Sequence, residues 1–256
     1  MTKLTQFLIK IVKKSAKFAN EAFIVSKKGD GDDLITDADI KIEKFLIKKI
    51  KARFGDVDIV SEELNAQKDL TPNCFVIDPI DGTINFASGL PLWGIQVCAV
   101  RGGEPVSAVL YFPRLKKIYY ADGTGAFSAD VCSGGLFSAS ALSNKQAIRV
   151  SDKPFNKSIY VVEGGDKFPA LKTMTKTVSR HFRYICCASL NFAWTADGHF
   201  GGTILRKDTI WDYLPGLYLV KQAGGIIIDV SGAHIGANND ELAQVLFNKA
   251  RLKPET

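Results

Sequence analysis

The sequence has few of the residues on which thiol and imidazole chemistry depend. Its five cysteines are an odd number and contain no C-x-x-C pair, which argues against a disulfide framework and against a structural zinc site. The three histidines are scattered along the chain, which argues against an imidazole metal site or a histidine-based catalytic triad. Any catalytic chemistry is therefore expected to depend on other side chains.

Long apolar runs are also missing, since none approaches the ~20 residues that span a bilayer. Residues 1–23 alternate lysines with apolar residues and lack the apolar core of a signal peptide. Residues 1–54 hold 13 Lys and Arg against 7 acidic residues, but no aromatic residues interleave with these lysines as in nucleic-acid sites. We expect a soluble cytoplasmic protein with solvated basic helix faces and with no membrane or nucleic-acid partner.

Hydrophobic periodicity defines the first part of the chain. Residues 3–24 have apolar side chains at helical spacing. A second such helix, which Thr36 or Asp37 caps, carries Ile42, Phe45, Leu46, Ile50 and Phe54. Residues 27–33 are a polar loop. Strands are expected at 58–63, 74–77, 95–99, 106–112 and 118–121, with a turn at 123–127 back into the sheet. Residues 1–145 are thus predicted to be a lobe of helices layered on a largely antiparallel sheet.

The second part of the chain alternates between short apolar strands and amphipathic helices. Strands are expected at 159–162, 184–186 and 226–230, and helices at 169–179, 188–196, 211–223 and 240–250. This βαβ rhythm predicts an α/β lobe over residues 146–256 that completes the site of the first lobe.

The segment Asp78-Pro79-Ile80-Asp81-Gly82-Thr83 is the most informative stretch of the sequence. A buried apolar run ends in a carboxylate, and Pro79 removes a backbone donor before a second carboxylate follows. The turn brings two carboxylates and the Ile80 carbonyl toward one point, an arrangement of oxygens that suits Mg²⁺. If Gly82 and Thr83 open a helix, their N–H groups would hold a phosphate. The pattern predicts a magnesium-dependent phosphatase site.

Three further acids occupy similar local settings. Glu62 ends a strand, while Asp39 and Asp212 lie near helix starts. Each acid alone is explained by a turn, a cap or a solvated strand end. Taken together with the proline, glycine and threonine around Asp78, they favour one shared site.

These motifs resemble the inositol monophosphatase family. The resemblance is carried by Ser61-Glu62-Glu63, by D-P-I-D-G-T-I-N-F at 78–86, by Trp211-Asp212 followed by Gly224-Gly225, and by L-I-T-D-A-D at 34–39. It implies an α/β (α+β) fold, the five-layered αβαβα sandwich of the sugar phosphatase type. It also implies a homodimer that hydrolyses a small phosphorylated substrate with two to three Mg²⁺ ions, for which Mn²⁺ substitutes, and that is often inhibited by lithium.

The resemblance also assigns roles to individual residues. It implies that the metal ligands are Glu62, Asp78, the Ile80 carbonyl, Asp81 and Asp212. It implies catalytic roles for Glu62 and Thr83, which would orient the attacking water, and for Asp39, which would help a third ion or its water. The substrate side would be formed by Ile80, Asp81, Gly82, Thr83, Cys187, Ala188, Ser189 and Asp212. Ser189 would either hydrogen-bond the substrate or cap a helix.

Two positions depart from the family pattern. Ile84 replaces a second threonine, for which we expect only a tuning effect. Leu205 stands seven residues before Asp212, where inositol phosphatases carry a glutamate that binds substrate hydroxyls. Arg206 and Lys207 beside it are either solvated or able to meet a second anionic group.

The substrate therefore stays open at this point. It is an inositol monophosphate-like or sugar phosphate, or alternatively a fructose bisphosphate, histidinol phosphate or 3′-phosphonucleotide. Two non-enzymatic alternatives also remain. One is a binding protein that senses a phosphorylated metabolite without turnover, and the other is a nucleic-acid-associated protein that uses Lys10, Lys13, Lys14 and Lys17.

Overall fold

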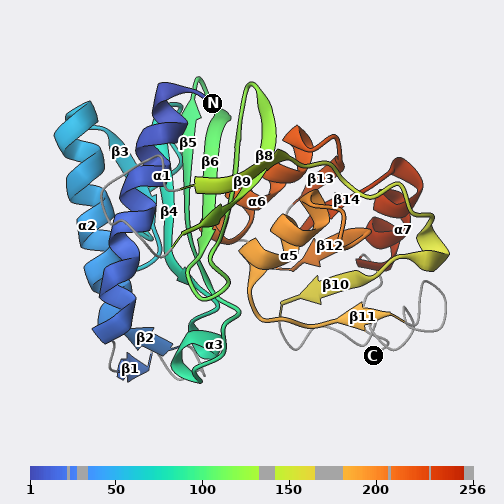
Figure 1. Cartoon of the computed structure of the whole chain (residues 1–256), viewed down its shortest axis with the longest axis horizontal. Coiled ribbons are helices and arrows are strands. Elements are labelled where there is room, and N and C mark those ends of the chain that lie inside the picture. Colours follow the sequence, from blue (N-terminus) through green and yellow to red (C-terminus); the bar gives the residue numbers. More distant parts are fainter. Residues whose placement is uncertain are drawn as a thin grey trace.

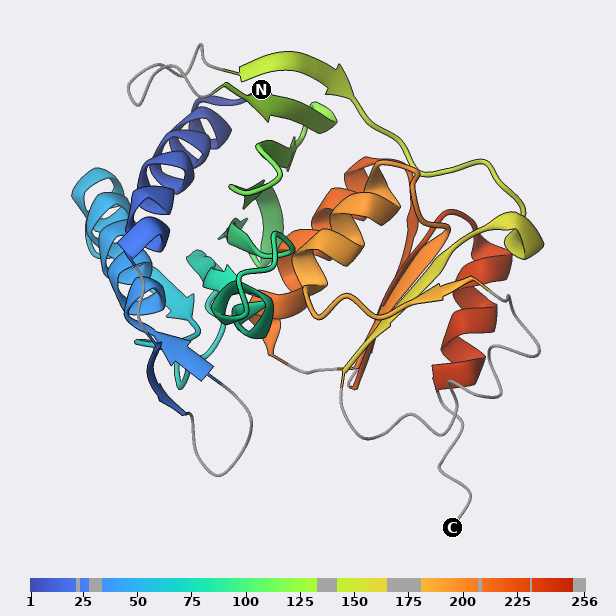
Figure 2. The ribbon, with the colours of Figure 1, turned by 60° about the horizontal axis from the view of Figure 1, so that its bottom comes forward.

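Two sheets and three helical layers alternate across the molecule in the order helix, sheet, helix, sheet, helix (Figure 1). This computed structural model describes residues 1–21, 24–27, 34–132, 142–164, 181–206, 209–230 and 232–250. The two outer helical layers are α1 with α2 on one side and α7 on the other, and α5 and α6 lie between the sheets (Figure 2). The predicted five-layered αβαβα sandwich is confirmed.

The helices have the following bounds: α1 Lys3–Ser15, α2 Asp37–Phe54, α3 Thr83–Ala87, α5 Ala188–Ala196, α6 Ile210–Gln222 and α7 Asp240–Ala250, with short 3₁₀ helices η1 Ala16–Glu21 and η3 Phe155–Lys157. The helix expected over 3–24 is shorter, since α-helical geometry ends at Ser15, whose hydroxyl donates to the Val12 carbonyl. Thr36 is the N-cap of α2 and forms a capping box with Asp39.

The larger sheet has seven strands in the order β3-β4-β5-β6-β7-β8-β9. They are β3 Asp58–Ser61, β4 Cys74–Asp81, β5 Gly94–Arg101, β6 Glu104–Phe112, β7 Lys117–Asp122, β8 Gly125–Val131 and β9 Leu142–Ala147. Only β3 and β4 are parallel, which confirms a largely antiparallel sheet. Every residue of β4 is buried, because helices cover both faces of the sheet. A separate small ribbon pairs β1 Ile24–Lys27 with β2 Leu34–Thr36.

The smaller sheet has five strands in the order β11-β10-β12-β14-β13. They are β10 Tyr160–Glu163, β11 Phe182–Arg183, β12 Gly202–Leu205, β13 Ile226–Val230 and β14 Ala233–Ala237. Strand β10 runs parallel to β11 and β12, whereas β14 runs antiparallel to β12 and β13. The strand predicted at 184–186 is wrong, because the extended segment is Phe182–Arg183 and Cys186 has a left-handed φ of 58°.

The hydrophobic core has one cluster on each side of the larger sheet and a third beside α7. The cluster around α5 and α6 includes Phe112 of the larger sheet and Leu205 of the smaller one, so both sheets pack on the same two helices. Gly216 allows this close packing, since a Cβ there would lie 2.5 Å from the Phe192 ring. Among the described residues, no helix has the length and apolar character to cross a membrane.

Three sequence predictions lie wholly or partly outside the described residues. They are the loop over 27–33, in which the described residue Lys27 is the end of strand β1, the helix over 169–179 and the side chain of Lys207. The division into lobes at 145 and 146 stays a prediction, and it falls within strand β9.

Candidate active site

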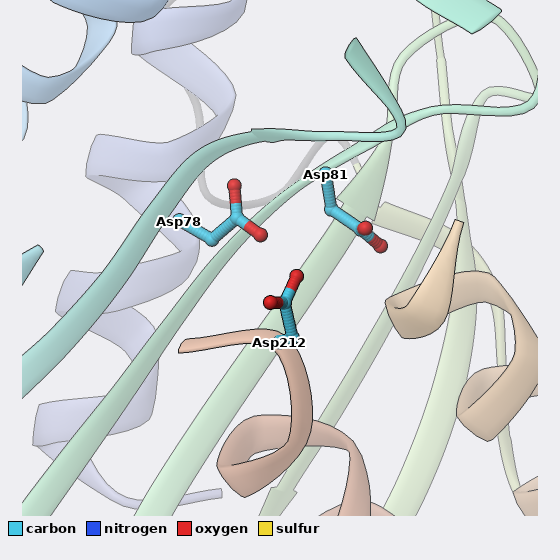
Figure 3. Close-up of side chains that lie close together, drawn as sticks. All are labelled: Asp78, Asp81 and Asp212. Atoms are coloured by element: carbon cyan, nitrogen blue, oxygen red, sulfur yellow. The ribbon is translucent and has the colours of Figure 1, made fainter. Parts of the chain in front are cut away.

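A cavity of about 710 Å³ opens at the end of β4, between the two sheets. Three buried carboxylates line it: Asp78 and Asp81 from β4, and Asp212 from the first turn of α6. Each offers an oxygen within 4.8 Å of the oxygens of the others, and Figure 3 shows the three side chains directed toward one another. The acids that the sequence assigned to one site from two distant segments therefore meet.

The end of β4 turns because of its local sequence. Asp78 pairs with Gln96 of β5, the register then shifts, and Asp81 rejoins the ladder opposite Gly94. Pro79 has no N–H to donate, which suits a position in such a bulge. Gly82 follows with a φ of 84°, and a Cβ there would lie 3.0 Å from the carbonyls of Leu92 and Cys186. This position requires glycine for both its backbone angle and its space.

Asp81 is held by the start of helix α5. The backbone N–H groups of Ala188 and Ser189 donate to its two carboxylate oxygens at 3.1 and 2.6 Å. The Cys187 thiol lies 3.1 Å from the same carboxylate. Ala188 lines the cavity, whereas Cys187 and Ser189 are fully buried and contact Asp81. The N-cap of α5 is Cys187, and no side chain caps this helix, so the capping role considered for Ser189 is wrong. Its predicted contact with substrate stays a prediction.

Asp212 is held by the start of helix α6. The hydroxyl of Thr209, at the N-cap position, donates to the Asp212 carboxylate. Trp211 lies between them in sequence and also lines the cavity. We did not predict a role for Thr209 from the sequence. Its spacing to Asp212 is the T-x-x-D pattern that is typical of helix starts, and this signal was available.

Burial and mutual repulsion raise the pKa values of two cavity carboxylates. Burial raises the pKa of Asp78 well above its usual range, and the charges of Glu62, Asp81 and Asp212 add to this rise. Burial also raises the pKa of Asp81, followed by the charge of Asp212, while donors from Ser189 and Cys187 oppose the rise. Clustered carboxylates that disfavour ionisation are stabilised by a bound cation.

The donor set fits a hard divalent cation. The Oδ1 atom of Asp78 is buried and has no hydrogen-bond partner in the described structure. The carbonyl-bearing Ile80 lines the same cavity as the three carboxylates. Oxygen ligands of this kind are those that Mg²⁺ and similar ions prefer.

Glu62 lines the cavity immediately after β3 but lies outside the close group of three carboxylates. The turn that carries Glu62 is fixed by Glu43 of α2. Glu43 accepts hydrogen bonds from the Ser61 hydroxyl at 2.5 Å and from the N–H groups of Glu63 and Leu64 at 2.9 and 2.8 Å. The sequence analysis missed Glu43. Its signal is an acid four residues after Asp39, on the buried face of the same helix.

Asp39 and Thr83 occupy different surroundings. Asp39 is fully buried and does not line the cavity, and its Oδ2 accepts from the Thr36 N–H and hydroxyl. Burial raises the pKa of Asp39 to about 6, although the bonds from Thr36 oppose this. Thr83 lines the cavity, and its hydroxyl donates to the Ile80 carbonyl at 3.0 Å. The catalytic roles of Asp39, of Glu62 and of Thr83 stay predictions.

The remaining cavity wall carries the positions that depart from the family pattern. Leu205 is fully buried and lines the cavity, and Arg206 lines it beside Leu205. Ile84 and Tyr184 also line it, and they are 48% and 60% exposed. The cavity wall is thus acidic around Asp78, Asp81 and Asp212. Around Leu205, Arg206, Ile84 and Tyr184 it combines apolar, basic and aromatic side chains.

Comparison with known proteins agrees with this geometry. Residues 1–253 match the model of the inositol monophosphatase family. A Thermotoga maritima protein named fructose-1,6-bisphosphatase/inositol-1-monophosphatase is 32% identical over 222 residues, which cover 83% of this chain and 78% of that protein. A Mycolicibacterium smegmatis protein named inositol-1-monophosphatase ImpA is 29% identical over 207 residues, covering 79% of this chain and 72% of that protein.

A solved structure titled Thermotoga maritima IMPase superposes with a TM-score of 0.82 at 27% identity, covering 97% of this chain and 98% of the other. The family match extends over nearly the whole chain, and Glu62, Asp78, Asp81 and Asp212 all line the cavity. The chain therefore belongs to the inositol monophosphatase family, a family of phosphoric monoester hydrolases.

Proposed function

We propose that this protein is a Mg²⁺-dependent phosphomonoesterase that hydrolyses a small phosphorylated metabolite by direct attack of water. The observation that carries this proposal is the group of three buried carboxylates whose oxygens lie within 4.8 Å of one another. Burial and mutual repulsion disfavour the ionised form of such a group, and a bound cation would offset this. The group also lines a cavity large enough for a phosphorylated small molecule.

The cavity residues have two proposed roles, which are to bind the metal ions and to accept a proton from water. Asp78, Asp81 and Asp212 would hold the ions together with Glu62 and the Ile80 carbonyl. When bound, two to three Mg²⁺ or Mn²⁺ ions supply charge neutralisation at the phosphate and a lowered pKa for water. Glu62 would accept the proton of the attacking water through the Thr83 hydroxyl, which is general-base catalysis.

The wall around the substrate differs at position 205 from the inositol-binding wall that the resemblance implies. Leu205 cannot accept a hydrogen bond, although the resemblance places a glutamate there. The Thermotoga maritima relative carries both a bisphosphatase and a monophosphatase name. We propose a sugar phosphate or an inositol monophosphate-like ester as substrate, with Arg206 available for a second anionic group on it. We also propose that the enzyme works as a homodimer.

A panel of phosphate esters tests the reaction class. Purified protein is incubated with Mg²⁺ and each ester, and released phosphate is measured, with an excess of chelator as the matched control. We expect release from at least one ester and none in chelator. Binding that stabilises the protein without phosphate release would instead indicate a non-catalytic sensor, and release that is unaffected by chelator would contradict the metal dependence.

A further inference from the structure

The carboxylate of Glu163 lies beside position 205, where the family pattern has a glutamate and this chain has a leucine. Glu163 is the last residue of β10, and in the parallel register of β10 and β12 it is the partner of Leu205. Both residues line the cavity that contains Asp78, Asp81 and Asp212. Neighbouring parallel strands lie about 4.8 Å apart, so a side chain at 163 projects from a point one strand away from 205.

Helix α5 fixes this carboxylate in the cavity wall. The Asn191 side-chain amide donates to Glu163 Oε2 at 2.5 Å, and the Cys187 N–H donates to the same oxygen at 3.3 Å. The next two N–H groups of this helix start, those of Ala188 and Ser189, hold Asp81. One rigid element therefore sets the position of Glu163 relative to a predicted metal ligand.

The chemistry of the wall defines what Glu163 is able to recognise. An ionised carboxylate has about four acceptor sites and no donor, so it pairs with hydroxyl groups or cations of a ligand. It repels the phosphate itself, which places it on the leaving-group side of the cavity. The same wall carries Arg206, whose N–H donates to the Glu163 carbonyl at 2.8 Å, and the exposed ring of Tyr184.

We propose that Glu163 is a substrate-binding residue that accepts hydrogen bonds from hydroxyl groups of the leaving group. This inference rests on the proposed phosphatase function and narrows its substrate class to hydroxyl-bearing esters, namely sugar or polyol phosphates. The carboxylate that the family pattern places at 205 is supplied from the neighbouring strand. Glu163 should therefore not contribute to the binding of an ester whose leaving group has no hydroxyl.

The variant Glu163→Gln tests the assignment. Glutamine keeps one carbonyl oxygen for Asn191 and for the Cys187 N–H, so the contact with α5 is retained while the charge is removed. Steady-state kinetics with Mg²⁺ are measured on inositol 1-phosphate, whose leaving group is a polyol, and on phenyl phosphate, whose leaving group has no other hydroxyl. The matched control is Glu104→Gln, at an exposed position on β6.

We expect kcat/KM of Glu163→Gln to fall roughly 10- to 100-fold on the polyol ester, mainly through KM, as for the loss of a hydrogen bond to a charged group. Turnover of phenyl phosphate should change less than about threefold, and Glu104→Gln should leave both unchanged. An equal loss on both esters would show that Glu163 acts only through α5 and would overturn the assignment. Failure of the unsubstituted protein to hydrolyse any ester of the panel would overturn the phosphatase function, whereas turnover of phenyl phosphate without turnover of the polyol ester would overturn the assignment of Glu163 alone.

Discussion

The buried carboxylate Asp122 and the group of three cavity carboxylates lie at opposite ends of the larger sheet and differ in what surrounds them. Asp122 ends β7, level with the start of β4, whereas the cavity lies at the end of β4. Asp122 accepts from the Thr2 N–H at 2.7 Å, the Thr5 hydroxyl at 2.8 Å and the Thr124 hydroxyl at 2.6 Å. Burial raises the pKa of Asp122, but these donors outweigh it and lower the pKa to about 2.

Asp78 of the cavity is, by contrast, surrounded mainly by other carboxylates. Asp78 accepts one described hydrogen bond, from the Gln96 side chain at 3.2 Å, and faces the charges of Asp81 and Asp212. Burial disfavours ionisation in both places, so the difference comes from the neighbours. Because it accepts these hydrogen bonds, Asp122 acts as an anchor that holds the start of the chain on the larger sheet. Because the cavity carboxylates repel one another, a bound cation is expected to stabilise the cavity.

The largest expected effect is the loss of activity when a cavity carboxylate is replaced. Replacing Asp81 by asparagine removes one predicted ligand while most of its contacts with α5 remain possible. We expect kcat/KM to fall by more than about 100-fold, since even outer partners of metal ligands typically cost 10–100-fold. The circular dichroism spectrum should be unchanged. Near-normal phosphate release by Asp81→Asn would refute the metal assignment.

Added Mg²⁺ should stabilise the cavity and leave the Asp122 anchor unaffected. At a concentration 100 times its Kd, Mg²⁺ should raise the free energy of unfolding by about 2.7 kcal/mol. Urea unfolding with and without the ion measures this. The increase should disappear in Asp78→Asn, which should be no less stable than the unsubstituted protein without metal. A full Mg²⁺ response in Asp78→Asn would contradict the proposed ion site.

Removing the Asp122 charge should lower the free energy of unfolding, whereas added Mg²⁺ should raise it. Because its pKa falls from 3.8 to about 2, ionised Asp122 contributes about 2 kcal/mol above pH 4, and this is lost as the pH falls toward 2. We expect Asp122→Asn to lose this amount at pH 7 while kcat stays normal. The control is Asp56→Asn, at a side chain that is 99% exposed. Equal unfolding midpoints for the two variants would argue against the anchor.

The smallest expected effect is a pH response of the metal-free protein. The pKa of Asp39 is raised to about 6, so its ionisation opposes folding, and protonation relieves this as the pH falls. Between pH 7 and pH 5 this residue should add about 1 kcal/mol of stability. Thermal unfolding across this range measures the gain, with Asp39→Asn as comparison. A slope that is the same in both proteins would assign the response to other groups.

Much of the site was predictable because its signals are local. The buried run before Asp78, the proline and glycine of the turn, and the capping residue Thr36 each act within a few positions. Glu62 and Asp212, which the sequence assigned to the same site, both line the cavity, and their roles as metal ligands stay predictions. The roles of Glu43, Thr209 and Glu163 were missed, and two of these three residues act on segments far away in the sequence.

Several elements of the smaller sheet were also missed for a physical reason. Strand β12 begins at Gly202, and Gly236 lies within β14, so both strands are short and lack a clear alternation of apolar and polar residues. Both are nevertheless buried, because helices α5 and α7 cover the sheet on opposite sides. Their pairing depends on contacts with β10 and β13 that the local pattern does not encode.

The amino-acid sequence by itself determined helices α5, α6 and α7, the buried β4 strand, the turn after it and the types of side chain available for chemistry. These depend on propensity, capping and periodicity, which act over a few residues. Only the tertiary structure decided that the N–H groups of α5 hold Asp81 and that Glu163 stands beside Leu205. Such placements depend on how two sheets pack on shared helices, since burial and repulsion are set by neighbours that are distant along the chain.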